Sequence, residues 1–281
     1  MVTPLRYPGS KNKLYLYMRY LVESNSIKTY VEPFVGGGSL ACKLLLNGDV
    51  DRVIINDYDR SVYAFWYCVF YDTASLIQMI RDTEVTIEEW HRQRDILKTR
   101  STNDNLLELG FSMLFCNRTN RSGILTAGVM GGLRQDGNCK LDCRFNKEKI
   151  IEKINVLSKL RDQVSVYNLD VNDFLNEIEL SEDVLIFLDP PYYVKGPALY
   201  AESFKEACHS RLSNTLKSLK NTKWVLTYDK VDEVAILYEG FDKIDFCLNY
   251  SAARRVLATE VMYFSSVVDK GTYKMYLKQP E

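Results

Sequence analysis

The segment Asp189-Pro190-Pro191-Tyr192 carries the clearest chemical signal in the sequence. It directly follows the apolar run 184–188, which has the composition of a buried strand, so it lies at the carboxyl end of that strand, where open α/β sheets bind ligands. The two prolines lack N–H donors and fix the backbone, which leaves the preceding carbonyl groups rigidly aimed. With an aspartate and a tyrosine ring, these carbonyls suit a planar ring that bears an exocyclic amino group. The alternative is a Pro-Pro turn whose neighbours are merely solvated.

A glycine turn, Gly36-Gly37-Gly38, separates a predicted strand over residues 29–34 from a predicted helix over residues 39–46. Glycines at this position let the backbone turn sharply and approach a ligand closely. Asp57 lies about 20 residues further on, after a second predicted strand over residues 52–56, where an acidic residue commonly accepts hydrogen bonds from a ribose. The spacing fits a nucleoside-containing cofactor, whereas a turn that only caps a helix is the alternative. No G-x-x-x-x-G-K-[ST] segment supports a phosphate-binding P-loop.

Alternating strands and helices position both segments. An apolar helical run over residues 62–70 continues the pattern, and this βαβ order implies a parallel sheet with right-handed crossovers. The alternation returns later in the chain, with an antiparallel pair predicted at the edge of the sheet. The later strands are predicted over residues 164–167, 184–188, 223–227, 244–248 and 261–265, with a helix over residues 212–219.

The middle of the chain has a different character. Helices are predicted over residues 86–98, 105–116 and 147–161, and residues 117–146 are rich in Gly, Asn and Arg. A stretch of that length in a compact domain indicates a functional loop, with or without a hairpin. The organisation expected is a catalytic domain of residues 1–75 and 160–281 with an inserted, mainly helical recognition domain of residues 76–159.

Length and composition agree with this organisation. A chain of 281 residues is near the upper limit for one hydrophobic core. The apolar fraction of 46% and the charged fraction of 26% are those of a globular protein and exclude a disordered or collagen-like chain. The apolar stretch 63–71 is too short to cross a bilayer, which needs about 20 residues. Residues 1–20 are basic without an apolar stretch, so no secretory signal is expected.

The cysteines and histidines argue against a metal site. Seven scattered cysteines without a C-x-x-C pair indicate reduced thiols in a cytoplasmic setting. With only His91 and His209, catalysis or metal binding by several histidines is excluded. Cys116, Cys139, Cys143 and His91 have a poor spacing for zinc, so no metal is expected.

The charge distribution hides a basic segment. The net charge of −1 argues against a nucleic-acid partner when taken alone. Residues 91–161, however, contain 14 Lys and Arg against 7 Asp and Glu, so the rest of the chain is acidic. A chain divided in this way can bind a polyanion through its basic middle.

Taken in order, these motifs resemble those of the Dam-like DNA adenine methyltransferases, in the alpha arrangement that places the glycine turn before the insert and D-P-P-Y after it. The resemblance covers nearly the whole chain, and it is the ordered set that is specific. Residues 117–146 differ from those of members with a G-A-T-C target, so that recognition sequence is not carried over. The segments that resemble the family are Leu5-Arg6-Tyr7-Pro8-Gly9-Ser10-Lys11, Glu32-Pro33-Phe34-Val35-Gly36-Gly37-Gly38-Ser39, Asn56-Asp57, residues 117–123, 144–146 and 224–229, and Asp189-Pro190-Pro191-Tyr192.

The resemblance implies a Rossmann-like α/β fold and S-adenosyl-L-methionine as the methyl donor. Asp57 would hold the ribose hydroxyls. Asp173 and Phe174 are candidates for the contact with the adenine ring of the cofactor, with Asp170 as a competitor, although they could equally be a helix N-cap followed by a core aromatic residue. The cofactor-binding residues expected are Tyr7, Lys11, Glu32, Phe34, Gly36, Gly38, Asp57, Asp173, Phe174 and Asp189.

The resemblance also implies methyl transfer to the exocyclic amino nitrogen of adenine in double-stranded DNA, with Asp189, Pro190 and Tyr192 as catalytic residues. Hydrogen bonds from the amino group to the Asp189 carboxylate and the Pro190 carbonyl would draw the nitrogen toward tetrahedral geometry and stabilise the developing positive charge. No strong base is needed, because the methylated nitrogen is acidic. Since a base inside a duplex cannot reach such a site, the adenine must flip out and stack on Tyr192.

The basic middle is the expected source of DNA contacts. Arg and Asn side chains on a long loop suit the guanine and adenine edges of the major groove. For each arginine alone, the alternative is a solvated surface charge. The DNA-binding residues expected are Arg92, Arg94, Asn117, Arg118, Asn120, Arg121, Arg134, Lys140 and Arg144.

Alternative functions stay open at this point. A methyltransferase could act on cytosine N4, an RNA adenine or a protein glutamine, but Asp189 favours adenine and the arginine-rich insert favours a nucleic acid. A DNA-binding regulator without catalysis would not need Asp57, Asp189 and Tyr192 intact. A place in a restriction-modification or defence system is compatible with the family, and no partner protein is predicted.

Overall fold

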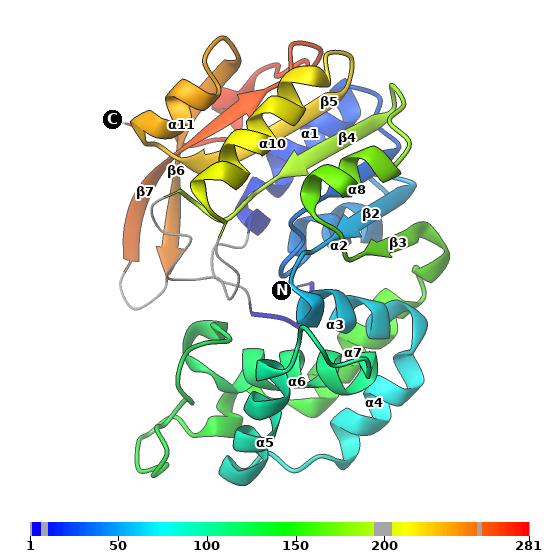
Figure 1. The fold of residues 1–281 in the computed structure, drawn as a ribbon, viewed down its shortest axis with the longest axis vertical. Helices are drawn as coiled ribbons and strands as arrows, with labels where there is room; N and C mark the ends of the chain where they lie inside the picture. The colour runs from blue at the N-terminus through cyan, green and yellow to red at the C-terminus, as the bar shows by residue number, and fades with distance from the viewer. Residues whose placement is uncertain (1, 7–10, 194–203, 252–254, 281) are drawn as a thin grey trace.

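A mixed sheet of seven strands forms one half of the structure (Figure 1). The computed structural model describes residues 2–6, 11–193, 204–251 and 255–280, and within them the strand order is β3-β2-β1-β4-β5-β7-β6. The strands are β1 (Thr29–Glu32), β2 (Arg52–Asn56), β3 (Val164–Tyr167), β4 (Val184–Leu188), β5 (Lys223–Asp229), β6 (Asp242–Ser251) and β7 (Arg255–Phe264).

The first five strands are parallel, as predicted. β1 pairs with both β2 and β4, β3 pairs with β2, and β5 pairs with β4. The antiparallel pair β6–β7 is also confirmed, but β7 inserts between β5 and β6, so that of these two strands β6 lies at the edge of the sheet and β7 does not. The carboxyl ends of the parallel strands therefore meet at one edge of the sheet, where both site-forming motifs begin.

Helices cover both faces of the sheet, which explains the continuous apolar runs of its strands. On β1, Tyr30 packs into the core on one face and Val31 into the core on the other. The Tyr30 face is covered by α1 (Tyr15–Ser24), α2 (Ser39–Leu46) and α3 (Arg60–Tyr71), and the Val31 face by α8 (Val171–Glu177), α10 (Glu206–Ser218) and α11 (Asp232–Leu237).

The inserted segment is helical, as predicted. It contains α4 (Thr73–Asp82), α5 (Ile87–Lys98), α6 (Leu106–Thr119) and α7 (Lys147–Ser158), which lie below the sheet in Figure 1. α6 is its central helix, because its residues from Leu109 to Asn117 are all buried. Residues 120–146 form short 3₁₀ turns and one antiparallel bridge between Asn120 and Val129, not a regular hairpin.

Some elements go beyond what periodicity predicts. α1, α4, α8 and α11 are not among the predicted helices, and α10 begins at Glu206, ahead of the predicted start at Leu212. The first turn of α10 is polar and partly exposed, so apolar spacing marks only its second half. The predicted helix over residues 39–46 and the strands over residues 52–56 and 164–167 match α2, β2 and β3.

The described residues contain neither a membrane-spanning helix nor a metal-binding group of side chains. Within the part of the chain that the structure describes, no helix has the length and apolar character needed to cross a membrane. The same residues contain no group of three or more His, Cys, Asp or Glu side chains placed to hold a metal ion.

Candidate active site

The glycine turn follows β1 and leads directly into α2. Gly36 and Gly38 have φ values of 43° and 56°, in the left-handed region that favours glycine. A Cβ added to Gly38 would lie 2.5 Å from the indole carbon Cζ2 of Trp66, so a side chain there would displace this ring. The indole Nε1 of Trp66 donates to the Gly36 carbonyl at 2.9 Å, which fixes the turn on helix α3.

Asp57 closes the turn from the end of β2. Its Oδ2 accepts a hydrogen bond from the Gly36 backbone N–H at 2.9 Å, and its Oδ1 accepts one from the Asp59 N–H at 3.0 Å. The preceding residue, Asn56, donates to the carbonyls of Pro33 (3.0 Å) and Leu169 (3.1 Å). The ends of β1 and β2 and the segment after β3 are thereby held together around one half-buried carboxylate.

Asp189 stands beside this turn because β4 runs parallel to β1, with Ile186 opposite Val31. Its side chain is only 19% exposed. The hydroxyl of Thr227, on the neighbouring strand β5, donates to Asp189 Oδ1 at 2.7 Å and fixes the carboxylate. The structure therefore places the acidic residue of D-P-P-Y next to the glycine turn, as the sequence predicts.

Lys11 links the catalytic candidates. Its ammonium is buried, donates to the Tyr192 hydroxyl at 2.7 Å and lies 3.1 Å from Asp189 Oδ1. On its other side it lies 3.5 Å from Oε2 of Glu260, a residue of β7 that is 1% exposed. Lys11, which is also a predicted cofactor residue, thus lies against the catalytic motif, between two carboxylates.

Burial weakens the acidity of the carboxyl groups around this site. Desolvation, reinforced by the charge of Glu260 and opposed by Lys11, raises the pKa of Asp189. Desolvation raises the pKa of Glu32 to about 8, and the nearby charge of Asp189 adds to this effect against a hydrogen bond of 3.1 Å from Tyr30. Desolvation and the charge of Asp59 raise the pKa of Asp57 to about 7, although two backbone N–H groups bind its charged form. Of the acidic residues around this site, Asp189 and Glu260 lie against Lys11.

The segment after Asp189 is held by β5. The Tyr193 backbone N–H donates to Asp229 Oδ1 at 3.0 Å, and the Tyr192 ring lies 6.3 Å from the ring of Tyr228. The Tyr228 hydroxyl is in turn bonded to Nδ1 of buried His209 at 2.6 Å. His209 thus supports the Tyr228 ring, which lies beside Tyr192.

Comparison with known proteins decides the family. The model of the family described as D12 class N6 adenine-specific DNA methyltransferase matches residues 7–251. The chain belongs to this D12 class. The predicted family, enzyme class and adenine-directed DNA methylation are therefore confirmed, and a methyl donor of the S-adenosylmethionine type and a DNA substrate follow from the class.

One curated relative is also a methyltransferase by name. The D12 methyltransferase described here is 26% identical over 263 residues to the Type II methyltransferase M.MjaIII of Methanocaldococcus jannaschii, covering 85% of this chain and 88% of the relative. A structure assigned as an RNA methyltransferase, PH1948 of Pyrococcus horikoshii, aligns with a TM-score of 0.43 at 13% identity over 94% of this chain and 88% of that one. The latter similarity is too low to bear on the substrate.

The predicted cofactor residues fall into two groups. Glu32, Phe34 and the glycine turn lie together with Asp57, while Tyr7 lies outside the described residues. Phe174, in contrast, is fully buried and packs against the ring of Tyr167 at 5.5 Å. The prediction that Phe174 contacts the cofactor does not agree with this burial, and its side chain instead fills the core beneath α8.

The predicted contact between Asp173 and the cofactor stays a prediction. Asp173 is 65% exposed in the first turn of α8 and lies 3.5 Å from Arg211. The N-cap of this helix is Asp170, which accepts a hydrogen bond from the Asn172 N–H at 3.0 Å. Of the two interpretations of this segment, the structure favours a capped helix with a core aromatic residue, with Asp170 as the cap.

Two predicted DNA contacts need correction. Asn117 and Asn120 have no exposed surface. Asn117 accepts a hydrogen bond from the Arg6 N–H at 2.8 Å and donates to the carbonyls of Arg6 and Gly123, both at 2.9 Å. Asn120 accepts from the indole of Trp90 at 2.7 Å and donates to two loop carbonyls. Both amides are used inside the protein, so they shape the loop and cannot reach DNA in this structure.

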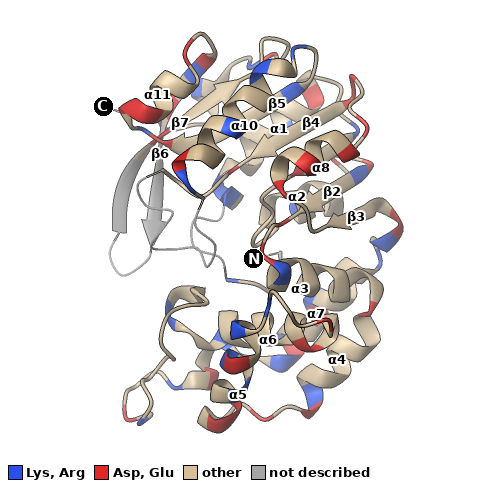
Figure 2. Ribbon diagram, in the orientation of Figure 1, with Lys and Arg blue, Asp and Glu red and all other residues tan. Residues whose placement is uncertain are grey.

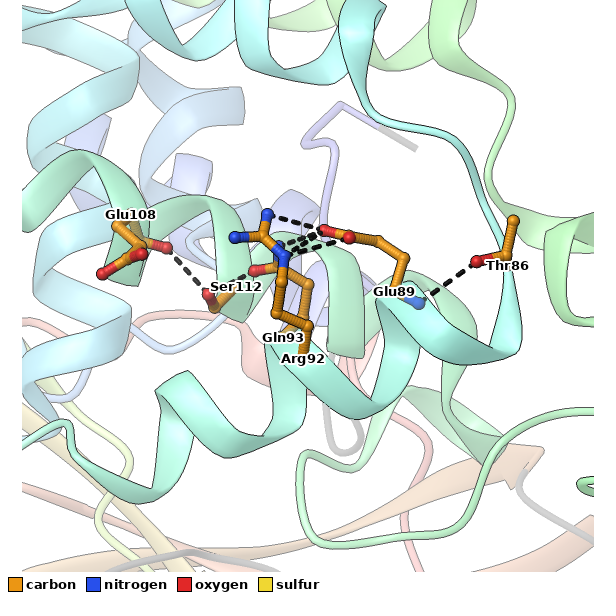
Figure 3. A network of polar contacts seen from close by, with 6 residues as sticks. All are labelled: Thr86, Glu89, Arg92, Gln93, Glu108 and Ser112. Carbon is orange, nitrogen blue, oxygen red and sulfur yellow. Dashed lines mark hydrogen bonds and ion pairs between the residues drawn. The ribbon is translucent and has the colours of Figure 1, made fainter.

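The two arginines of α5 are partly committed to protein contacts. Arg92 pairs with Glu89 at 2.9 Å, and the same carboxylate accepts from Gln93, whose side chain accepts from Ser112 of α6 (Figure 3). The Arg94 guanidinium lies over the ring of Trp90, 5.0 Å from its centre. This network fixes α5 on α6, and DNA contact by either arginine stays a prediction.

The remaining basic candidates lie in the last turn of α6 and on the loop that follows it. Basic residues are distributed along the insert and its loop in Figure 2. Arg118 is partly buried, whereas the side chains of Arg121, Arg134, Lys140 and Arg144 are exposed. Exposure is what a DNA contact requires, so these residues stay candidates.

Sequence reasoning missed Glu260. It belongs to no motif. Its position beside the site depends on the pairing of β7 with β5 and β6, which the local sequence does not show. The one available signal is an acidic residue inside an otherwise apolar strand, Val261 to Phe264, since such a residue is buried only when paired.

Proposed function

We propose that this D12 methyltransferase transfers the methyl group of S-adenosyl-L-methionine to the exocyclic amino nitrogen of an adenine flipped out of double-stranded DNA. The observation that carries the proposal is the adjacency of Asp189 and Tyr192, held by Lys11, to the glycine turn closed by Asp57. It brings an acceptor for an amino group and an acceptor for a ribose to one edge of the sheet.

The residues present fit such a methyl donor, which supplies a methyl group on a positively charged sulfur. The turn at Gly36 and Gly38 adopts a backbone conformation that brings main-chain groups close to a ligand. Each Asp57 oxygen accepts one backbone N–H and keeps a further lone pair for a ribose hydroxyl. The Asp189 carboxylate offers negative charge near a sulfonium, whereas the Glu32 carboxyl, whose pKa burial raises to about 8, offers a neutral polar group.

Asp189 and Pro190 would prepare the acceptor. The amino nitrogen of adenine is a weak nucleophile because its lone pair is delocalised into the ring. Hydrogen bonds from the amino group to the Asp189 carboxylate and the Pro190 carbonyl favour tetrahedral geometry and stabilise positive charge on nitrogen. The nitrogen gains the methyl group and then releases a proton, so the mechanism needs neither a histidine nor a cysteine.

Tyr192 would receive the flipped base, and the insert would support the extruded state. Flipping costs a few kcal/mol, which contacts between DNA and the exposed basic residues of the insert must offset. Tyr192 offers a flat ring whose hydroxyl is fixed by Lys11 and which lies beside Tyr228. If a restriction enzyme cleaves the same recognition sequence, the methyltransferase would protect DNA in a restriction-modification or defence system.

Asp189→Ala tests the catalytic assignment. Removing one preorganised electrostatic group commonly costs about 10²–10³ in kcat, so methyl transfer should fall by at least about 100-fold. The fold should persist because Glu260 still accompanies Lys11. The measurement is transfer of labelled methyl from S-adenosylmethionine to unmethylated genomic DNA, followed by nucleoside analysis.

The matched control is Asp51→Asn, because Asp51 is exposed at the amino end of β2, at the opposite edge of the sheet. It should transfer methyl groups at the wild-type rate. Labelled methyl found in N4-methylcytosine would support cytosine as the substrate, and label transferred only to RNA would support an RNA adenine. DNA binding without any transfer by the wild-type protein would support the regulator, and near-normal turnover by Asp189→Ala would place the active site elsewhere.

A further inference from the structure

Three arginines gather where the N-terminal segment meets the insert. Arg6 precedes Lys11 in the chain, Arg118 ends α6, and Arg144 ends the 3₁₀ turn Leu141–Arg144. Arg118 Nη1 donates to the Pro4 carbonyl at 3.3 Å. Among the described residues, none of the three arginines forms a salt bridge with an acidic side chain. We call these residues the arginine cluster.

The arginine cluster is partly buried and electrostatically unbalanced. Nη1 of Arg6 and Nε of Arg118 are buried and have no hydrogen-bond partner among the described residues. Burial, then the charges of Arg6 and Arg144, lowers the pKa of Arg118 to about 10, and burial with Arg144 lowers the pKa of Arg6. Burial, and then repulsion by Arg118, lowers the pKa of a fourth cation, Lys153. Buried donors normally have partners, so these donors and the positive charge around them suit an anion.

The cluster is built on a rigid support and lies near the catalytic motif. The Asn117 side chain binds both the N–H and the carbonyl of Arg6, and a Cβ at Gly123 would lie 2.0 Å from that carbonyl, so the two segments are in close contact. Arg6 is five residues from Lys11, and a chain of that length spans at most about 18 Å. The N-terminal segment runs between the sheet and the insert helices in Figure 1.

We propose that Arg6, Arg118 and Arg144 bind a backbone phosphate of the DNA strand that carries the extruded adenine. This inference rests on the proposed function. A phosphodiester supplies the missing negative charge and several acceptor oxygens, which the planar donors of arginine match well. A base edge carries no net charge and would leave the repulsion uncompensated. One phosphate would then bridge the two segments next to the active site.

The salt dependence of DNA binding tests the phosphate contact. We compare wild type with Arg144→Gln, whose side chain is exposed, and with the control Arg161→Gln, an exposed arginine paired with Asp162. Binding of a mixed-sequence duplex is measured against salt concentration. Loss of one phosphate contact reduces the slope of log K against log salt by about 0.9. We expect this reduction for Arg144→Gln and no change for Arg161→Gln; equal slopes for all three proteins would overturn the proposal.

Thermal stability gives a second readout that a merely structural arginine would not show. Arg118→Gln relieves repulsion, so without DNA its melting temperature should equal or exceed that of wild type. Adding the duplex, or inorganic phosphate as a small probe, should raise the melting temperature of wild type more than that of the variant. A lower melting temperature for Arg118→Gln, with an undiminished shift on adding DNA, would contradict the proposal.

These outcomes are separate from those of the proposed function. At saturating DNA, the control Arg161→Gln should methylate at the wild-type rate, because Arg161 lies outside the arginine cluster and pairs with Asp162. If wild type transfers no methyl group, the proposed function fails while the salt slopes still test the cluster. If transfer occurs and the slopes coincide, only the cluster proposal fails.

Discussion

At the scale of single residues, the charge balance of the active site depends on Lys11. One buried ammonium lies between the carboxylates of Asp189 and Glu260, at 3.1 and 3.5 Å. Within the group of described residues Lys11, Asp189 and Glu260, removing the cation leaves two buried acids, whereas removing one acid leaves a balanced pair. The two kinds of substitution should therefore differ in their effect on stability.

Lys11→Met should lower the free energy of unfolding by about 3–5 kcal/mol, the usual cost of breaking a buried ion pair. Glu260→Gln should cost clearly less, because Lys11 keeps Asp189 and the Tyr192 hydroxyl. Urea unfolding at neutral pH measures both values. A greater loss for Glu260→Gln than for Lys11→Met would show that Glu260, and not Lys11, is the essential member of the group.

Glu32 predicts a pH dependence of stability. Its pKa is raised by burial from 4.5 to about 8. Between these values the folded state holds a proton that the unfolded state releases, so the free energy of unfolding falls as pH rises, by up to about 1.4 kcal/mol per pH unit. Below the unfolded pKa this contribution is fully present, and above about pH 8 it is lost.

Glu32→Gln should flatten this part of the stability curve, because glutamine keeps an acceptor for Tyr30 but does not titrate. Unfolding by urea from pH 5 to pH 9 gives the comparison, with exposed Glu88→Gln as the matched control. Parallel curves for wild type and Glu32→Gln would mean that Glu32 is ionised throughout and that its burial is relieved in solution.

At the scale of elements, the turn between β1 and α2 connects a backbone conformation to ligand binding. Gly38 has φ +56°, and its Cα faces the Trp66 ring. Gly48, at the end of the same helix, has φ +68° but no atom within 4 Å of an added Cβ. A substitution by alanine would strain the backbone at both glycines, but only the Cβ at position 38 would clash with a neighbouring side chain.

Gly48→Ala should cost about 1–2 kcal/mol, the price of left-handed backbone in a residue with a side chain. Gly38→Ala should cost more than this, because the ring of Trp66 and its hydrogen bond to Gly36 must also shift. Chemical denaturation measures both costs, and calorimetry with S-adenosylmethionine should show weaker binding for Gly38→Ala alone. If Gly38→Ala and Gly48→Ala had equal stability and equal affinity for S-adenosylmethionine, the contact between Gly38 and Trp66 would not constrain this turn.

At the scale of the whole molecule, the sheet and the insert share one hydrophobic core. The core on the Tyr30 face of the sheet includes Ile55 of β2, Phe65 of α3, Trp90 of α5 and Phe111 of α6. Leu5, from the N-terminal segment, belongs to it as well. The insert helices bury their apolar residues in this same cluster. We therefore expect that the insert cannot unfold independently of the sheet.

Calorimetry should therefore record a single unfolding transition for sheet and insert, with equal calorimetric and van't Hoff enthalpies. Trp90→Phe, which also removes the indole donor to Asn120, should lower the temperature of that one transition. Two resolved transitions, of which only one moves in Trp90→Phe, would contradict the shared core.

The sequence by itself determined the elements and the order of the motifs. The strands before the glycine turn and before Asp189, and the helices of the insert, follow from apolar periodicity, which depends on residues close together in the chain. Turn residues such as Gly36 and Pro190 act through their own backbone, so their roles can also be predicted locally. The ordered motifs were sufficient to indicate the family.

Only the tertiary structure decided which side chains meet. Glu260 reaches Lys11 because β7 inserts beside β5, and Asn117 is buried because the N-terminal segment crosses α6. Phe174 likewise belongs to the core and not to the site. Burial and ion pairing arise from contacts between residues far apart in the chain, and local patterns do not encode those contacts.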